Sequence, residues 1–152
     1  KIGVISMAII EGKAYWANIT VPNTKFEPMY VINLIVPDKV ADDFKMRGCS
    51  VKQMDEGKAL IIKRKVADNQ GNLKPVPKLF DKFKNPITDR VGNGSTVKVQ
   101  YREFDWEYGT KFGKGLDLQA VQVIDLVEAA VPDGLELDAE ETEETEQGEV
   151  EL

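Results

Sequence analysis

Alternating hydrophobic and polar residues predict a protein built mainly from β-strands. Residues 14–21 and 95–106 alternate between the two classes, which is typical of strands with one buried face. Residues 29–36 form a nearly continuous hydrophobic run rich in β-branched residues, and this composition predicts a strand covered on both sides. Residues 59–66 predict a further strand. The chain therefore contains several segments suited to a common sheet.

Three of the strand-like segments carry information about side-chain direction. In residues 14–21 one parity predicts a shared face for Tyr15, Ala17, Ile19 and Val21. In residues 95–106 the same argument predicts a shared buried face for Val97, Val99 and Tyr101. Residues 115–127 predict a final strand, but their alternation changes parity near Ala120. This change indicates a bulge or a strand that bends around a barrel.

A short helix is predicted directly after residue 37. Asp38 is placed to cap this helix, and Gly48 follows its expected end. Val40 and Phe44 are four residues apart, which puts them on one inner face. One short helix with about five strands predicts a mainly β fold, either a small barrel or a sandwich.

Charged residues divide the chain into two regions. Residues 128–152 contain 11 acidic residues and no basic one, so residues 1–127 keep 15 acidic and 20 basic residues, a net charge of +5. Self-repulsion and a shortage of hydrophobic residues predict that the acidic region is disordered. We therefore expect a folded domain over residues 1–130 and an acidic disordered tail over residues 131–152.

The scarcity of cysteine and histidine limits the chemistry. Cys49 is the only cysteine and there is no histidine, which excludes an internal disulfide, a Cys2His2 zinc site and catalysis by imidazole. We expect Cys49 to be a small packing residue, and we expect neither a cofactor nor an enzymatic activity. No run approaches the roughly 20 hydrophobic residues of a membrane span. A single cysteine fits a reduced, cytoplasmic location.

The outward face of residues 95–106 and its continuation combine aromatic with basic side chains. Bases of single-stranded nucleic acid stack on aromatic rings, and Lys and Arg hold the phosphates. The same combination recurs near residue 16 and in the Lys-Arg-Lys run at residues 63–65. The residues predicted to stack on bases are Trp106, Tyr108, Phe104 and Trp16. The residues predicted to contact phosphates are Lys98, Arg102, Lys111, Lys114, Lys63 and Lys65.

The acidic tail favours the same function for an independent reason. A basic groove that holds phosphates also attracts a flexible polyanion on its own chain, so the tail can occupy the groove until DNA displaces it. Once released, the tail can contact basic patches of partner proteins. A tail that only improves solubility is the alternative. The tail residues expected to take part are Glu140, Glu141, Glu143, Glu144, Glu146, Glu149, Glu151 and Leu152.

Other functions remain open from the residues alone. Phe104 and Trp106 also fit a second hydrophobic layer, and together with Tyr108 they fit a protein-interaction or virion β-domain. Asp105 and Glu107 are two residues apart on one strand face, as in a metal-dependent nuclease, but no third ligand follows at a recognisable spacing.

A series of short motifs runs through residues 94–127. It contains a Gly-Ser turn, an alternating strand, a glycine after an aromatic β-loop and a final strand, here Gly94-Ser95, Lys98-Val99-x-Tyr101, Gly113 and Leu116-x-Leu118-Gln119. This series resembles the C-terminal half of the OB-fold in the single-stranded DNA-binding proteins of short-tailed bacteriophages. Residues 14–22 and 29–39 resemble earlier strands of that family, and an acidic tail ending in a hydrophobic residue completes the pattern.

The resemblance implies a five-stranded OB-fold barrel with one short helix, which binds single-stranded DNA without sequence preference during phage DNA replication, recombination and repair. It places Trp106 at the position of a base-stacking aromatic residue and Tyr108 beside it. It also implies that the acidic tail, ending at Leu152, competes with DNA and recruits replication proteins such as DNA polymerase and helicase–primase. A homodimer is a further expectation, because a tail can reach a neighbour's groove. The implied location is the cytoplasm of the host cell.

Overall fold

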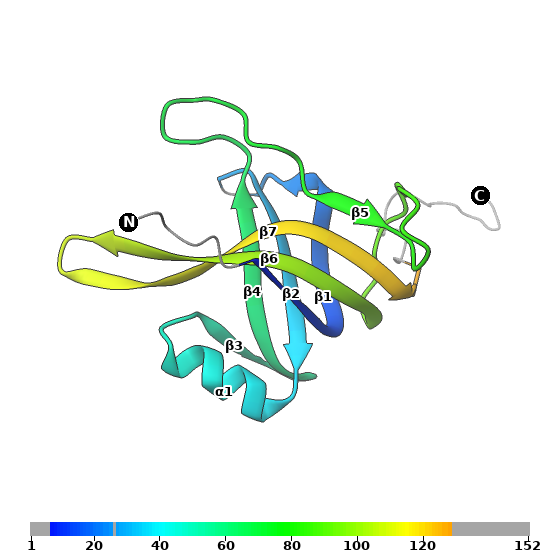
Figure 1. Ribbon diagram of the computed structural model, residues 1–152, viewed down its shortest axis with the longest axis horizontal. Coiled ribbons are helices and arrows are strands. Elements are labelled where there is room, and N and C mark those ends of the chain that lie inside the picture. The colour runs from blue at the N-terminus through cyan, green and yellow to red at the C-terminus, as the bar shows by residue number, and fades with distance from the viewer. Residues whose placement is uncertain (1–6, 26, 129–152) are drawn as a thin grey trace, which may run out of the picture.

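The computed structural model describes residues 7–25 and 27–128, which contain seven strands and one helix (Figure 1). The acidic tail predicted over residues 131–152 lies outside the described residues. The elements in chain order are β1 (Met7–Asn23), β2 (Met29–Val36), α1 (Asp38–Met46), β3 (Val51–Met54), β4 (Gly57–Lys65), β5 (Lys78–Phe80), β6 (Ser95–Tyr108) and β7 (Lys111–Asp125).

Five of the strands form a closed barrel. The sheet runs in the order β3-β4-β2-β1-β6-β7-β5, and a further pairing between β4 and β7 closes it. The closing contact is parallel and joins Lys63 to Asp117, whereas the other pairings around the barrel are antiparallel. The helix follows β2 along the chain. A closed five-stranded barrel with one short helix confirms the predicted OB-fold.

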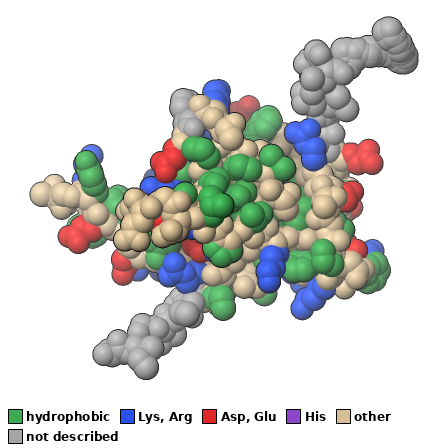
Figure 2. Space-filling model, turned by 90° about the horizontal axis from the view of Figure 1, so that it is seen from above, with side chains coloured by type: hydrophobic (Ala, Val, Ile, Leu, Met, Phe, Trp, Pro, Cys, Tyr) green, Lys and Arg blue, Asp and Glu red, His purple; other side chains and the backbone are tan. Residues whose placement is uncertain are grey.

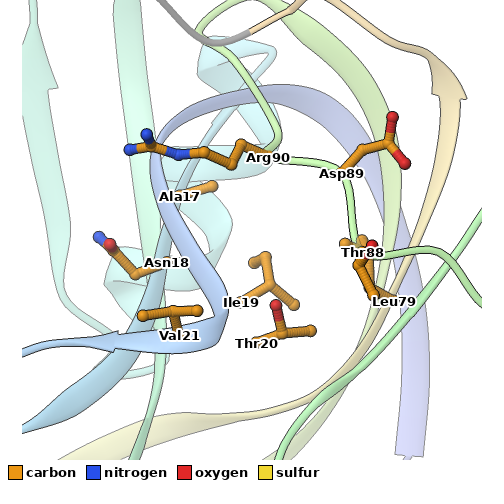
Figure 3. A pocket seen from close by; sticks show the side chains of 9 residues that line it. All are labelled: Ala17, Asn18, Ile19, Thr20, Val21, Leu79, Thr88, Asp89 and Arg90. Carbon is orange, nitrogen blue, oxygen red and sulfur yellow. The ribbon is translucent and has the colours of Figure 1, made fainter. Parts of the chain in front are cut away.

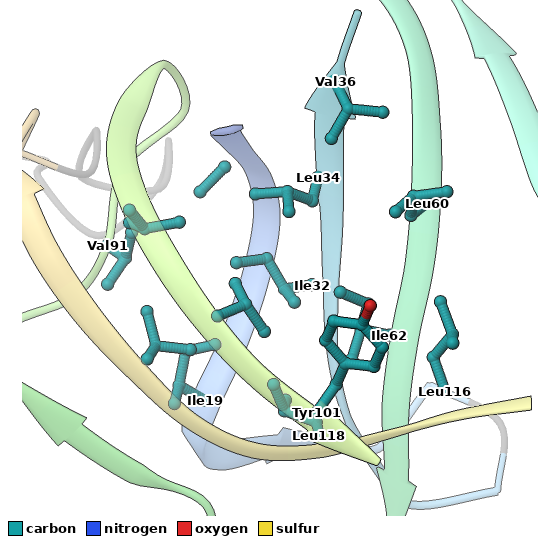
Figure 4. Close-up of a cluster of buried hydrophobic side chains, with 14 of the residues drawn as sticks. Ile19, Ile32, Leu34, Val36, Leu60, Ile62, Val91, Tyr101, Leu116 and Leu118 are labelled. Carbon is teal, nitrogen blue, oxygen red and sulfur yellow. The ribbon is translucent and has the colours of Figure 1, made fainter. Parts of the chain in front are cut away.

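Aliphatic side chains fill the interior of the barrel (Figure 4). Full burial of one such side chain contributes about 1.5–3 kcal/mol relative to leaving it exposed. Since every second residue of a strand points inward, this core also determines which side chains face the solvent. The largest side chains with no exposure are Ile32, Leu34, Leu60, Ile62, Leu118, Val97, Val99 and Val121.

The side-chain directions predicted for β6 are confirmed, and the parity change predicted in β7 is a bulge. Two consecutive residues of β6 pair with Leu118 and Ala120, so Gln119 is an extra residue on β7. Leu118 and Val121 are therefore both fully buried although they lie three residues apart. The bulge bends β7 around the barrel, as the sequence pattern indicated.

The strict alternation predicted for residues 14–21 is wrong, because β1 contains a bulge of its own. Trp16 has a φ of +52°, in the left-handed region that non-glycine residues rarely adopt. The register between β1 and β2 shifts beside it and again nearer the end of the strand. Ala14 and Ile19 are consequently both buried although they are five residues apart, whereas Val21 is 71% exposed.

Helix α1 packs against the barrel through Ala41 and Phe44, which are both buried, and Val40 is partly buried beside them. The predicted capping by Asp38 is wrong, because Pro37 occupies the N-cap position and no side chain caps the helix. Asp38 is instead the first helical residue, where its negative charge favours the positive end of the helix dipole. No helix in residues 7–25 and 27–128 has the length and hydrophobicity to cross a membrane.

Candidate nucleic-acid interface

Strands β6 and β7 extend past the barrel as a two-stranded arm, defined here as residues 103–116. Strand β6 pairs with the described part of β1 as far as Arg102, and with β7 along almost its whole length, from Thr96 to Tyr108 opposite Lys111. The turn between the strands contains Gly109, whose φ of +62° is a conformation suited to glycine. The arm projects to the left in Figures 1 and 2, and hydrophobic, basic and acidic side chains lie close together on it.

Two glycines of β7 provide the surface on which the aromatic rings of the arm rest. Phe104 is paired with Gly115, and Trp106 is paired with Gly113. A Cβ atom at position 113 would lie 2.7 Å from Cζ2 of Trp106, and one at position 115 would overlap the ring of Phe104. Each ring therefore packs against β7 backbone while Phe104 stays 37% exposed and Trp106 42% exposed. An aromatic ring that packs on backbone with one face and leaves the other face exposed is suited to stacking on a base.

The two rings line a groove of about 550 Å³ between the arm and the outer face of β4. Strand β4 contributes alternate residues to this groove, because their neighbours Leu60 and Ile62 point into the core. Two of the lysines predicted to bind phosphates are thereby placed opposite the two aromatic residues. The lining residues of this arm groove are Ser50, Ile61, Lys63, Lys65, Phe104, Trp106, Lys114, Gly115 and Leu116.

The end of helix α1 fixes the base of the arm. The Lys114 N–H donates a hydrogen bond of 3.0 Å to the carbonyl oxygen of Gly48, which has a φ of +102°. The Arg47 guanidinium donates to the Glu103 carboxylate at 3.1 Å, and this hydrogen bond is the main cause of a raised pKa for Arg47. Cys49 is buried as expected, and burial raises the pKa of its thiol. These contacts attach the base of the arm to the end of α1.

The lysines of the arm groove differ in their partners. Lys114 Nζ lies 2.6 Å from an oxygen of Asp105, and this hydrogen bond raises the pKa of Lys114. Lys65 Nζ lies 3.5 Å from an oxygen of Glu27, while Lys63 is exposed and in no ion pair with the residues that the structure describes. A phosphate at Lys63 therefore displaces no carboxylate of the described residues, whereas one at Lys114 must displace that of Asp105.

Several predicted residues lie along the arm or β6 but outside the groove. The guanidinium of Arg102 is 5.8 Å from the ring centre of Phe104, within range of a cation–π contact. Tyr108 and Lys111 face each other at the far end of the arm, where Tyr108 is 83% exposed. Lys98 shares the outward face of β6 but lies six residues before Phe104, about 20 Å along the strand.

The structure separates Trp16 from the arm groove. Its backbone N–H donates a hydrogen bond of 2.8 Å to Oδ1 of Asn93, just before β6 begins. Ala14 pairs with Ser95, the first residue of β6, whereas Phe104 lies nine residues further on, about 30 Å along an extended strand. Trp16 is 60% exposed but does not share a surface with Phe104.

Arg64 lies between the two groove lysines in the sequence, but its side chain forms an ion pair that belongs to the barrel. It binds both carboxylate oxygens of Asp117, at 3.0 and 2.7 Å, and donates to the Pro75 carbonyl oxygen at 2.9 Å. Both side chains of the ion pair are nearly buried, with exposures of 12% and 11%. This pair links β4 to β7 beside the contact that closes the barrel.

The groove also contains residues that are not among the predicted DNA-binding residues. Ile61 shares its parity with Lys63 and Lys65, so its outward direction was readable from residues 59–66 once β4 was assigned. Ser50 follows the helix and carries no pattern that marks it. Gly115 acts through its missing side chain, and only its pairing with Phe104 reveals that.

The carboxylates considered for a nuclease lie on the arm. Asp105 is engaged by Lys114, and Glu107 is paired with Phe112 across the arm. The described part of the chain contains no group of three or more Cys, Asp or Glu side chains placed to hold a metal ion.

A second hollow, of about 330 Å³, lies on another side of the barrel (Figure 3). It is bounded by the second half of β1 and the segment that contains Thr88, Asp89 and Arg90. None of the residues predicted to bind DNA lines it.

The fold and the groove together define an OB-fold barrel with an exposed aromatic and basic cleft. Its structure is similar to gp2.5, a single-stranded DNA-binding protein encoded by bacteriophage T7, with a TM-score of 0.64 and 17% identity over 97% of this chain and 99% of that one. The single-stranded DNA-binding protein from bacteriophage Enc34 gives a TM-score of 0.56 and 13% identity over 83% of this chain and 85% of that one. The same Enc34 protein in complex with single-stranded DNA gives 0.56 and 13% over 81% and 89%.

These likenesses establish a fold shared with phage single-stranded DNA-binding proteins. No protein-family model and no curated protein sequence matches the chain.

Proposed function

We propose that this protein binds single-stranded DNA without sequence preference and uses the arm groove to do so. One observation carries the proposal: the barrel brings Lys63 and Lys65 of β4 opposite Phe104 and Trp106 of the arm. The fold shared with phage single-stranded DNA-binding proteins, one of them in complex with DNA, supports the same function.

Base stacking on aromatic rings and electrostatic attraction of phosphates both contribute to this binding. Bases stack on the exposed faces of Trp106 and Phe104, and each stacked base is worth about 1–3 kcal/mol. Lys63 and Lys65 neutralise phosphates in the groove, while Arg102, Lys111 and Lys114 extend the basic path along the arm. The net charge of +5 on residues 1–127 implies a modest affinity that falls steeply as salt rises.

The acidic region then acts as a competitor for the groove. The described chain ends at Glu128, which pairs with Val91 near the start of β6, about 30 Å or more from the groove. The remaining 24 residues, 129–152, can span up to about 80 Å when extended, so their carboxylates can reach Lys63 and Lys65. Displacement by DNA frees this region to recruit replication proteins such as a polymerase or a helicase–primase.

This activity suits a protein that protects single strands during phage DNA replication, recombination and repair in the cytoplasm of the host cell. The folded domain over residues 1–130, the disordered tail and a homodimer belong to the same proposal.

Tryptophan fluorescence tests the proposal directly, because the chain has two tryptophans and the structure separates them. Trp16→Phe leaves Trp106 as the reporter, and Trp106→Phe leaves Trp16. We expect oligo-dT to quench Trp16→Phe in a saturable, salt-sensitive manner and to leave Trp106→Phe almost unquenched. A protein-interaction domain would show no quenching in either variant and no gel shift, and that outcome would overturn the proposal.

A further inference from the structure

A second basic and aromatic surface lies at the opposite end of β6 from the arm groove. The tight hairpin at residues 81–85, here called the lysine hairpin, carries Phe83 between Lys82 and Lys84. Phe83 is 74% exposed, and Lys82 Nζ lies 5.4 Å from the centre of its ring. An exposed aromatic ring flanked by two cations is the local chemistry that stacks a base and holds its phosphates.

Asp81 is the centre of the hydrogen bonds that form the lysine hairpin. Its Oδ1 accepts hydrogen bonds from the N–H groups of Phe83 and Asn85, at 2.8 and 2.9 Å. The backbone of Asp81 also donates to Asn85 and accepts from Lys84, at 2.9 and 3.0 Å. Lys84 adopts a φ of +67°, which costs a non-glycine residue free energy. The tip therefore presents its side chains from a hydrogen-bonded turn.

The lysine hairpin adjoins the outward face of β6. The side-chain amide of Gln122 donates to the Lys82 carbonyl oxygen at 3.0 Å, which ties the hairpin to β7. Lys84 and Lys98 line a shared hollow of about 240 Å³, together with Ile9, Phe80, Gln100, Ala120 and Gln122. Glu11 pairs with Lys98 across the β1–β6 ladder, but no ion pair joins Lys82, Lys84 or Lys98 to another described residue.

One face of β6 connects this surface to the arm groove. Its outward positions read Lys98, Gln100, Arg102, Phe104 and Trp106, without an acidic residue. The distance from Lys98 to Phe104 is about 20 Å along the strand. One end of this path offers two aromatic rings with lysines, and the other offers Lys84 and Lys98 beside the hairpin whose tip carries Phe83. The positions between them offer amide and guanidinium donors.

We infer that the lysine hairpin and Lys98 form a second contact for the same single strand of DNA that occupies the arm groove. Phe83 stacks on a base, and Lys82, Lys84 and Lys98 neutralise phosphates beyond the groove. The inference rests on the proposed function and extends it by assigning a path along β6. It predicts that the hairpin increases the affinity of oligonucleotides long enough to reach both the arm groove and the hairpin. The affinity of shorter oligonucleotides should not depend on the hairpin.

The chain contains a matched control for this hairpin. Residues 68–72 form a hairpin of the same geometry, in which Asp68 Oδ1 accepts from the N–H groups of Gln70 and Asn72, both at 2.9 Å. Its tip reads Asn69-Gln70-Gly71, and Gly71 has the positive φ, +85°, that Lys84 has in the other hairpin. The tip sequences can therefore be exchanged without changing the turn.

Two full-length variants test the inference. The first carries Lys82→Asn, Phe83→Gln and Lys84→Gly, and the second adds Asn69→Lys, Gln70→Phe and Gly71→Lys, which restores the composition and net charge. Fluorescence anisotropy measures binding of labelled oligo-dT of about 5 and about 16 nucleotides, the range covered by single OB-folds. We expect both variants to bind the long oligonucleotide about tenfold more weakly and the short one within about twofold of the unmodified protein.

Each other outcome overturns the inference in a recognisable way. Unchanged affinity for the long oligonucleotide means that the hairpin does not touch DNA, as expected if it contacts a protein. Recovery of affinity in the exchanged variant means that only total charge matters. An equal loss of affinity for both oligonucleotides means that the hairpin affects binding indirectly, by changing the arm groove or the stability of the fold. If the unmodified protein binds neither oligonucleotide, the proposed function itself fails.

Discussion

Trp106 and Gly113 face each other across the arm, and the indole ring occupies the space that any side chain at position 113 would need. A large aromatic residue opposite a glycine can lie flat on the neighbouring strand instead of standing away from it. The ring then loses little freedom when a base stacks on its outer side. Gly113 does not itself line the groove, but it leaves the space in which the Trp106 ring lies.

Gly113→Ala is expected to weaken binding of single-stranded DNA about tenfold, because the new Cβ would lie 2.7 Å from Trp106 Cζ2 and displace the ring. Its φ is not positive, so alanine causes no backbone strain there. The measurement is affinity for oligo-dT together with the melting temperature. Thr110→Ala, in the turn of the arm, is the matched control. An unchanged affinity for Gly113→Ala would contradict the stacking role of Trp106.

Lys63→Gln is expected to reduce the salt dependence of binding. Each phosphate contact with a single strand contributes about −0.7 to the slope of log K against log salt. Since Lys63 lines the groove and is in no ion pair with the described residues, its loss should lower the slope by about that amount. Lys39→Gln, which removes an exposed charge from α1, should leave the slope unchanged. Equal slopes for both variants would exclude Lys63 from the phosphate path.

Asp117→Ala is expected to destabilise the barrel by about 3 kcal/mol, since it leaves a nearly buried Arg64 without its partner. Urea unfolding gives the free energy of unfolding. The combined change Arg64→Met with Asp117→Leu should cost clearly less than Asp117→Ala, because a hydrophobic pair needs no counter-charge. If the double variant is less stable than Asp117→Ala, the ion pair stabilises the fold by more than neutralising the charge of Arg64.

Stability is expected to fall in acid partly through the two Asp-anchored hairpins. Hydrogen bonds from the Asn85 and Phe83 backbones lower the pKa of Asp81 below its ordinary value of 3.8, and those from Asn72 and Gln70 act likewise on Asp68. A lowered pKa stabilises the fold above the ordinary value, and this contribution is lost as the pH falls through the lowered one.

Asp81→Asn keeps an oxygen acceptor but cannot titrate. We expect the difference in unfolding midpoint between the unmodified protein and this variant to shrink between about pH 5 and about pH 2. A difference that is independent of pH would contradict the assigned role of Asp81. Asp55→Asn, at an exposed position, is the control.

Removal of residues 132–152 is expected to tighten DNA binding, most strongly at low salt, because a competing polyanion is lost. A variant of unchanged length with the seven glutamates of residues 140–151 replaced by Gln separates charge from chain length. It should bind DNA as tightly as the truncated protein. Unchanged or weaker binding after truncation would exclude competition by the acidic region.

Much of the fold follows from short-range pattern. The pattern of residues 29–36, 59–66 and 95–106 predicts strands, and β2, β4 and β6 contain nearly all of these residues. Burial of one face makes every second residue of a strand hydrophobic, so the sequence of a strand predicts it without knowledge of its partner strands. The short strands β3 and β5 lack such a pattern and are not predictable in this way.

The aromatic and basic face of β6 and the parity change of β7 near Ala120 can both be predicted from the sequence, because each depends on neighbouring residues alone. Which of the predicted residues lie together depends on contacts between distant parts of the chain. Closure of the barrel between β4 and β7 brings Lys63 and Lys65 to Phe104 and Trp106, about 40 residues apart in the chain.

The same closure engages Arg64 with Asp117, and the register between β1 and β6 leaves Trp16 at the other end of β6. Register and closure depend on how the whole core packs, so no local pattern contains them.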